Sequence, residues 1–228
     1  MTGWIEFAAA MALFLISHRL PAWLGVKGWL QARLGAAGYV ALFSALSTAI
    51  LWWLILAAAR APFVPLWDQQ VWYRWAVNLA MPVVGLLAVF GVGAANPFAF
   101  EGRAGGYDPD RPGIAGLTRQ PLLWALALWA GVHLLPNGDL AHVLLFAPML
   151  VFSLAGMGLV ERRRRRAMGA AEWQRLTART GLVPLAALLS GRWRPQGSPS
   201  LVRLVIWAIA WALVWHLHAP VIGVWPGV

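Results

Sequence analysis

The sequence predicts an all-α fold, a polytopic transmembrane helical bundle of about six helices with both termini on the periplasmic side. Composition is the first observation behind this prediction. Of the 228 residues, 61% are hydrophobic and only 11% are charged, whereas a soluble domain carries roughly 25% charged residues. The second is that the apolar residues gather in long runs, and a helix that crosses a bilayer needs roughly 20 of them. The third is the uneven distribution of Lys and Arg between the runs.

Six runs qualify or nearly qualify as spans. Their predicted limits are 4–23, 36–59, 71–95, 120–135, 139–160 and 201–221. The fourth is short and ends in Pro136-Asn-Gly-Asp139, a sequence with strong turn chemistry. Asp139 is expected to be the N-cap of the fifth helix. A turn this short makes the fourth and fifth helices antiparallel neighbours. The sequence shows no internal repeat and no long linker, so residues 1–228 are predicted to form one integral membrane domain.

The positive charges predict the orientation of the bundle. Of the 18 Lys and Arg residues, all but Arg60 and Arg74 lie in the loops after the first, third and fifth spans or in the span ends that border those loops. Cytoplasmic loops collect Lys and Arg, so these loops, including a basic segment at 161–203, should face the cytoplasm of a bacterial inner membrane. The net charge of +10 is therefore a topology signal and does not indicate nucleic acid. The run Arg162–Arg166 is interpreted first as a flank that lies on anionic lipid.

The chain has no cysteine, which excludes disulfides, thiolate metal sites and Cys nucleophiles. It has five histidines, of which His18 and His133 fall inside predicted spans on different helices. An ionisable side chain within a span is costly and usually faces the bundle interior. Because His is the commonest metal ligand, this pair is a candidate for binding iron. The alternative is that each ring only joins helices through hydrogen bonds.

Several motifs resemble those of the NnrU family, named for a membrane protein linked to nitrite and nitric oxide metabolism. The most specific stretch is residues 128–140, Leu-Trp-Ala-Gly-Val-His-Leu-Leu-Pro-Asn-Gly-Asp-Leu, and residues 112–114 and 117–124 precede it. The resemblance continues through His18-Arg19, Glu161-Arg-Arg-Arg164, residues 175–180, residues 184–187 and Gly191-Arg192. It covers nearly the whole chain.

The resemblance also implies a cofactor. The family is related to 15-cis-zeta-carotene isomerase, a membrane enzyme that uses haem b with histidine ligands, and its ligands correspond to His18 and His133 here. Arg119 and Arg19 are candidates to pair with haem propionates near the inner surface. The alternative is that each only anchors its segment at the membrane interface. The implied partners are the lipid bilayer and either an apolar polyene substrate or nitric oxide-handling enzymes. One departure stands out, because the family usually has Thr-Arg-His-Pro where this chain has Thr118-Arg-Gln-Pro121.

Two other functions remain open. The layout is similar to that of membrane methyltransferases of the isoprenylcysteine carboxyl methyltransferase type, which use S-adenosylmethionine. The corresponding residues are Arg119, Gln120, Pro121, Glu161, Gly169, Trp173 and Pro184. A third class is a non-catalytic factor that assists the maturation of nitric oxide-handling enzymes. Turnover of a methyl donor, or a co-purifying carotenoid, distinguishes these functions.

Overall fold

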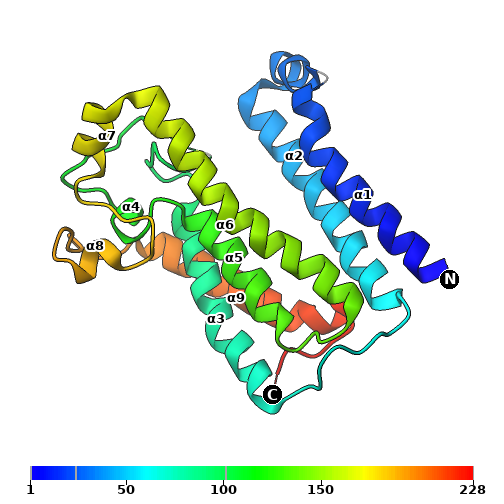
Figure 1. The fold of residues 1–228 in the computed structure, drawn as a ribbon. Helices are drawn as coiled ribbons and strands as arrows, with labels where there is room; N and C mark the ends of the chain where they lie inside the picture. The colour runs from blue at the N-terminus through cyan, green and yellow to red at the C-terminus, as the bar shows by residue number, and fades with distance from the viewer. Residues whose placement is uncertain (1, 24, 101, 228) are drawn as a thin grey trace. The chain divides into compact units, whose positions relative to one another are not determined.

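The computed structural model describes residues 2–23, 25–100 and 102–227, with the side chains of residues 19–23 and Ala36 left out (Figure 1). The described chain is helical and contains no β-strand, only two isolated bridges. It divides into two compact units. The first holds residues 1–69 and 137–146, and the second holds residues 70–136 and 147–228.

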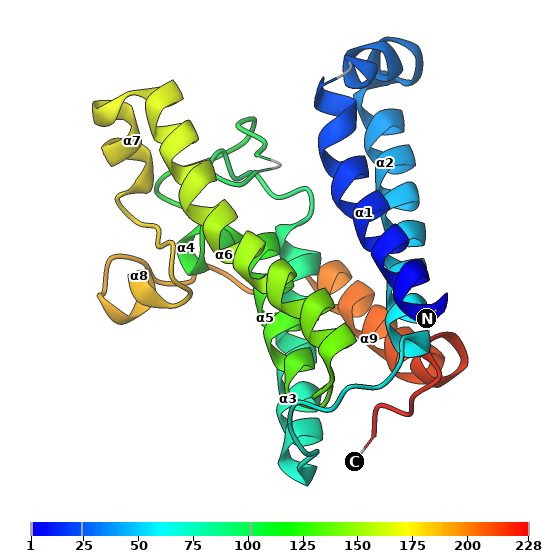
Figure 2. The same ribbon diagram turned by 45° about the vertical axis from the view of Figure 1, so that its right-hand side comes forward.

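The first unit is an antiparallel pair of helices, α1 (Thr2–Trp23) and α2 (Val26–Arg60), which lie side by side in both ribbon views (Figures 1 and 2). The helices approach closely where α1 begins and α2 ends, because a Cβ on Gly3 would stand 2.5 Å from the Arg60 carbonyl oxygen. α2 is interrupted at Gly35, whose φ of 72° is open to glycine without strain. The part beyond this kink, Ala37–Arg60, is long and apolar enough to cross a membrane.

A polar contact joins the same two helices. The Glu6 carboxylate accepts hydrogen bonds from Trp53 Nε1 at 3.0 Å and from Arg60 Nε at 3.1 Å. After α2 the chain is extended, and it pairs with the turn that precedes α6 (Leu140–Met168). Leu66 N donates to Gly138 O at 2.7 Å, and Leu140 N donates to Val64 O at 3.0 Å. These bonds hold the turn against the linker, within the first unit.

The second unit is built around α3 (Val71–Gly91), α5 (Pro121–Leu134) and α9 (Leu201–Ile222), with α3 in contact with both others. Small residues permit this packing. A Cβ on Gly91 would lie 2.9 Å from the Pro121 ring, and a Cβ on Gly85 would lie 3.0 Å from Trp207. The Trp207 Nε1 donates to the Pro82 carbonyl at 2.9 Å. A directional hydrogen bond thus joins α9 to α3 in addition to the packing of their side chains.

The expected antiparallel arrangement of the helices on either side of the Pro136–Asp139 turn is confirmed. Gly131 of α5 lies opposite Leu150 of α6, and Gly156 of α6 lies opposite Leu123 of α5. In each case a Cβ added to the glycine would lie 3.8 Å from the leucine side chain. The positions run in opposite directions along the two helices. Three short helices complete the unit: α4 (Ile114–Leu117), α7 (Ala170–Thr177) and α8 (Ala186–Leu189).

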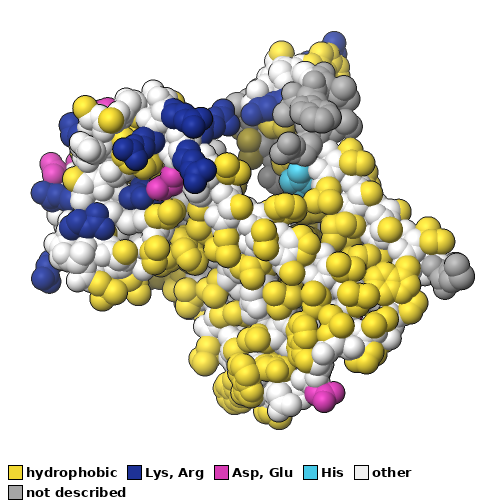
Figure 3. Space-filling model, in the orientation of Figure 1, with side chains coloured by type: hydrophobic (Ala, Val, Ile, Leu, Met, Phe, Trp, Pro, Cys, Tyr) yellow, Lys and Arg dark blue, Asp and Glu magenta, His cyan; other side chains and the backbone are white. Residues whose placement is uncertain are grey.

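Six apolar helices therefore lie where spans were expected, but they are unequal. Four are long and apolar enough to cross a membrane: Ala37–Arg60, Val71–Gly91, Leu140–Met168 and Leu201–Ile222. The apolar stretches Thr2–His18 and Pro121–Leu134 are shorter. Hydrophobic side chains cover the helices, and in the second unit Lys and Arg gather around the end of α6 and α7 (Figure 3). The chain is thus a helical membrane protein, and the number of helices that cross and the side of the termini remain predictions.

Candidate functional site

His18 and His133, the candidate iron ligands, are held in the same way within their own helices. In α1, His18 Nδ1 lies 2.7 Å from the Phe14 carbonyl oxygen, and the two rings are 4.4 Å apart. In α5, His133 Nδ1 lies 2.8 Å from the Trp129 carbonyl oxygen, with the rings 5.5 Å apart. Each imidazole thus sits one helical turn after an aromatic residue whose carbonyl it contacts and whose ring it touches.

This geometry determines which nitrogen can bind a metal. A carbonyl oxygen only accepts, so the Nδ1 of each ring carries a proton, and a metal would have to bind at Nε2. Histidines that bind metals commonly use their second nitrogen in this manner, which fixes the tautomer and the ring orientation. His18 is exposed and His133 is half-buried. The first belongs to one unit and the second to the other.

The other histidines are held differently. His142 Nδ1 lies 2.6 Å from Asp139 Oδ2, and the other oxygen of that carboxylate accepts from the His142 backbone N at 3.2 Å. Asp139 is therefore the N-cap of α6, as expected, and it also orients an imidazole, which the sequence analysis did not anticipate. His218 Nδ1 contacts the Val224 carbonyl at 2.6 Å, beyond the end of α9.

A polar cluster lies at the opposite end of α5 from His133, and we call it the Arg119 cluster, formed by Arg119, Glu161, Trp173 and Thr180. The Arg119 guanidinium donates two bonds to the Glu161 carboxylate, of which the Nη2–Oε2 bond is 2.9 Å. Its Nη1 donates to Thr180 Oγ1 at 3.0 Å, and its Cζ lies 5.6 Å from the Trp173 ring. Both charged side chains are mostly buried, 13% and 16% exposed, so they form an inward-facing ion pair and not a surface contact.

Backbone bonds hold this cluster in place. Arg119 N donates to Gly181 O at 2.8 Å, and Asn96 Nδ2 donates to Arg119 O at 3.0 Å. The Thr118 hydroxyl donates to Leu182 O at 2.7 Å. The segment before α5 is therefore bound on one side to the 92–100 loop and on the other to the segment after α7.

Gln120 is fully buried beside the cluster, with 1% of its surface exposed. Its Nε2 donates to the Phe98 carbonyl at 2.8 Å, whereas its Oε1 has no hydrogen-bond partner among the described residues. Phe98 also packs edge-on against Trp173 and Tyr107, with ring centres 5.4 and 5.2 Å away. Gln120 therefore joins α5 to a small aromatic core.

Tyr107 closes that core from the loop side. Its hydroxyl donates to the Leu176 carbonyl at 2.9 Å. Burial raises the pKa of this hydroxyl to about 12, because a phenolate would lose hydration in the aromatic surroundings.

The comparisons with known proteins agree with these motifs. The family described as NnrU protein matches residues 6–226, nearly the full length of the chain. The chain belongs to the NnrU family. No curated protein and no solved structure matches it.

Within this NnrU protein, the residues that carry the resemblance fall in two places. The Thr118-Arg-Gln-Pro121 motif and Glu161 meet in and beside the Arg119 cluster, although 42 positions separate the two charged residues. His133 stands apart from that cluster within the second unit. His133 ends α5 and Arg119 precedes it, so roughly 20 Å of helix separates them.

This arrangement changes the interpretation of Arg119. Its guanidinium is engaged by Glu161 and Thr180, and a propionate of a haem bound at His133 would have to reach the other end of α5. We therefore leave Arg119 out of the haem site proposed below. The Arg19 side chain lies outside the described residues. The methyltransferase-like layout is met in part, because three of its positions lie together: Arg119, Glu161 and Trp173. A fourth, Gly169, is the N-cap of α7 and has a φ of 82°.

Proposed function

We propose that this NnrU protein binds haem b through His18 and His133 and acts in nitrite and nitric oxide metabolism at the bacterial inner membrane. The observation that carries the proposal is that the two imidazoles make the same hydrogen bond within their helices. Each has Nδ1 bonded to the carbonyl four residues earlier, at 2.7 and 2.8 Å. Each ring is therefore held in a fixed orientation through Nδ1, as is common for histidines that bind a metal through Nε2.

The surroundings of the two rings suit a porphyrin. Phe14 and Phe43 flank His18, with ring centres 4.4 and 5.6 Å away, and Trp129 lies against His133. Aromatic and aliphatic side chains supply the flat apolar contacts that a macrocycle requires. No three His, Cys, Asp or Glu side chains gather into a metal-binding group in the described part of the chain.

His18 and His133 would be the residues that hold a haem and tune its potential, and the haem would supply a redox-active iron. The protein's own part is to exclude water with apolar helices and to hold both imidazoles as neutral ligands. A site of this kind handles small uncharged molecules such as nitric oxide, or an apolar polyene. The membership in the NnrU family favours the first, and the relation to the carotenoid isomerase keeps the second as the other substrate class.

The experiment is an absorption spectrum of the purified protein from cells grown with ample haem. We expect a Soret band with the spectrum of bis-histidine iron in the wild type, and its loss in His18→Ala and His133→Ala. His142→Ala and His216→Ala are the matched controls and should retain the band. A wild-type preparation without any Soret band, or equal losses in the controls, would contradict the proposal.

The substrate class is tested on the haem-loaded protein. A shift of the Soret band when nitric oxide is added under anaerobic conditions supports a role in nitric oxide handling. Isomerisation of a cis-carotene, or a carotenoid that co-purifies, supports the isomerase function.

A second candidate function, methyl transfer from S-adenosylmethionine, is favoured by one observation, the meeting of Arg119, Glu161 and Trp173. Against it, the Glu161 carboxylate is already engaged by Arg119, and neither described hollow of the surface is lined by these three residues. Binding of radiolabelled S-adenosylmethionine to the purified wild-type protein would favour this candidate, and no binding would remove it.

A further inference from the structure

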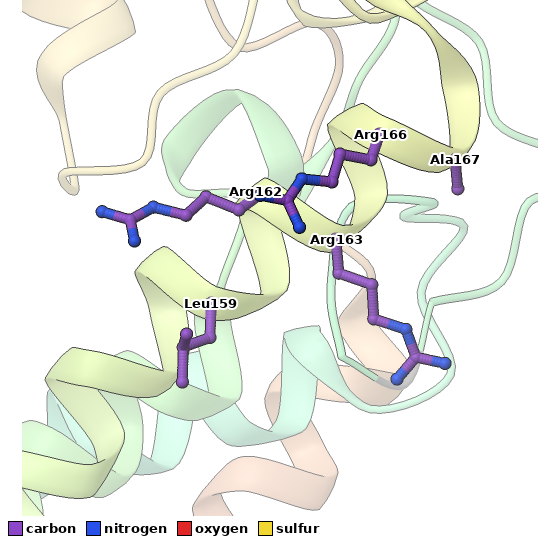
Figure 4. A pocket seen from close by; sticks show the side chains of 5 residues that line it. All are labelled: Leu159, Arg162, Arg163, Arg166 and Ala167. Atoms are coloured by element: carbon purple, nitrogen blue, oxygen red, sulfur yellow. The ribbon is translucent and has the colours of Figure 1, made fainter.

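The arginine run at the end of α6 is divided between two faces of the helix. Arg164 faces inward, where its Nη2 donates to the Ala99 carbonyl at 2.9 Å. Arg162, Arg163 and Arg166 face outward and, with Leu159 and Ala167, line a hollow of about 500 Å³ (Figure 4). These five positions follow the spacing of three and four residues that marks one side of a helix. The run therefore presents an organised cationic face in addition to a signal for topology.

None of the three outward arginines forms an ion pair with an acidic side chain that the structure describes. Every ion pair found in the described residues involves other side chains, and Arg119 already neutralises the adjacent Glu161. Three exposed guanidinium groups around one hollow are suited to a phosphate, because each presents a planar set of N–H donors to its oxygens.

The same side of α6 becomes apolar on moving toward the middle of the helix. Leu159, which is 63% exposed, lies about one turn before Arg162 and Arg163, and Phe152, which is 60% exposed, lies about three turns before them. A ligand on this face would therefore meet cationic groups at one end and an uncovered hydrophobic column at the other. A phospholipid has this order, with a phosphate in the headgroup and acyl chains beside it.

We propose that the face formed by Phe152, Leu159, Arg162, Arg163 and Arg166 is a binding site for an anionic phospholipid such as phosphatidylglycerol. The phosphate occupies the arginine-lined hollow and one acyl chain lies along the apolar column. This site shares no residue with the proposed haem ligands, and it goes beyond the proposed haem function.

The test measures retention of lipid by the purified full-length protein. The protein is delipidated in detergent and titrated with phosphatidylglycerol or with phosphatidylcholine, and adducts are counted by native mass spectrometry. We expect phosphatidylglycerol to bind preferentially to the wild type. Its affinity should fall roughly a hundredfold in R162Q/R163Q/R166Q, since each basic residue near an anionic lipid contributes about 1 kcal/mol.

The matched control removes the same charge elsewhere. R111Q/R165Q/R194Q replaces three exposed arginines outside the hollow. It should change the affinity less than about twofold, because the proposal assigns lipid binding to the hollow and not to the net charge of the protein. Circular dichroism checks that both variants keep their helices. If the triple variant does not fold, the single variants R163Q and R166Q should each weaken binding about fivefold.

Three results would overturn the proposal. One is an equal loss in the control triple variant, which would mean that only net charge matters. Another is an unchanged affinity of R162Q/R163Q/R166Q for phosphatidylglycerol. The third is full competition by millimolar glycerol phosphate, which would identify a site for a soluble phosphate and not for a lipid.

Discussion

At the scale of single residues, Gln120 is the one departure from the resembling Thr-Arg-His-Pro motif, and its buried contact shows what the position requires. Its Nε2 donates to the Phe98 carbonyl at 2.8 Å, and an imidazole N–H can make the same bond. We expect Gln120→His to keep the stability close to that of the wild type. Gln120→Leu should destabilise the protein by about 1–3 kcal/mol, because it leaves the Phe98 carbonyl buried without a donor. Unfolding in a detergent-denaturant series measures both, and equal stabilities of the two variants would refute this role.

The Arg119–Glu161 pair calls for a different test, since its two members are charged and mostly buried. Removing one partner leaves the other charge uncompensated, at a cost of about 3–5 kcal/mol. We expect Glu161→Gln and Arg119→Met each to destabilise the protein by about that amount. The double variant should be less destabilised than the sum of the two, because no unpaired charge remains. Strict additivity in this double-mutant cycle would show that the pair does not interact.

Tyr107 provides a dependence on pH at the alkaline end. Its pKa rises from about 10 in the unfolded chain to about 12 in the folded protein, because of burial. The folded state therefore binds more protons in this range, so stability is fully present below pH 10 and decreases as the pH rises through 12. We expect the wild type to lose more stability than Tyr107→Phe between these pH values. Parallel curves for the two proteins, measured by chemical unfolding, would contradict this assignment.

At the scale of elements, two glycines with opposite surroundings offer a matched comparison. A Cβ on Gly116 in α4 would lie 2.3 Å from the Trp193 ring, whereas a Cβ on Gly158 in α6 would meet nothing within 4 Å. Gly116→Ala should displace Trp193 and cost about 1–3 kcal/mol. Gly158→Ala should be neutral or stabilising by up to about 1 kcal/mol, because alanine restricts the unfolded chain. Thermal unfolding of both variants gives the comparison, and a neutral Gly116→Ala would mean that α4 and Trp193 do not pack as described.

The elements also show why some boundaries could be predicted and others not. Hydropathy placed the six apolar helices, because long apolar runs are what a bilayer selects. It ended the fifth at residue 160, whereas α6 continues to Met168. Arginine ends an apolar run but is a good helix former, so charge marks the membrane boundary and not the helix end. In the same way α2 begins at Val26, before its apolar part.

The candidate sites also contain features that the sequence predicts and features that only the fold reveals. The hydrogen bonds of His18 and His133 follow from helix geometry, since a carbonyl four residues earlier is always in reach, and the sequence had already indicated both residues. The Arg119–Glu161 contact joins positions 42 residues apart, so only the packing of α6 beside the segment before α5 brings them together. The sequence singled out both residues but assigned Arg119 to a propionate. The outward face of Arg162, Arg163 and Arg166 also required the fold, because it depends on which arginine turns inward.

At the scale of the whole molecule, the distribution of Lys and Arg predicts the orientation of the chain in the membrane. Cysteine labelling can test this orientation directly. Since the chain has no Cys, a single introduced cysteine is the only thiol available to a reagent. Asp68 lies in the exposed linker after α2, and Ser198 lies in the exposed segment before α9.

If the loops rich in Lys and Arg face the cytoplasm, Asp68→Cys should react with a membrane-impermeant maleimide in intact spheroplasts. Ser198→Cys should react only after the membrane is opened. The two positions flank helices on opposite sides of the predicted bundle, so each is the control for the other. Reaction of Ser198→Cys in intact spheroplasts, with protection of Asp68→Cys, would reverse the topology. Reaction of both would require a different number of crossings. The stretches Thr2–His18 of α1 and Pro121–Leu134 of α5 would be the first to reconsider, because they are shorter than the four apolar helices that are long enough to cross.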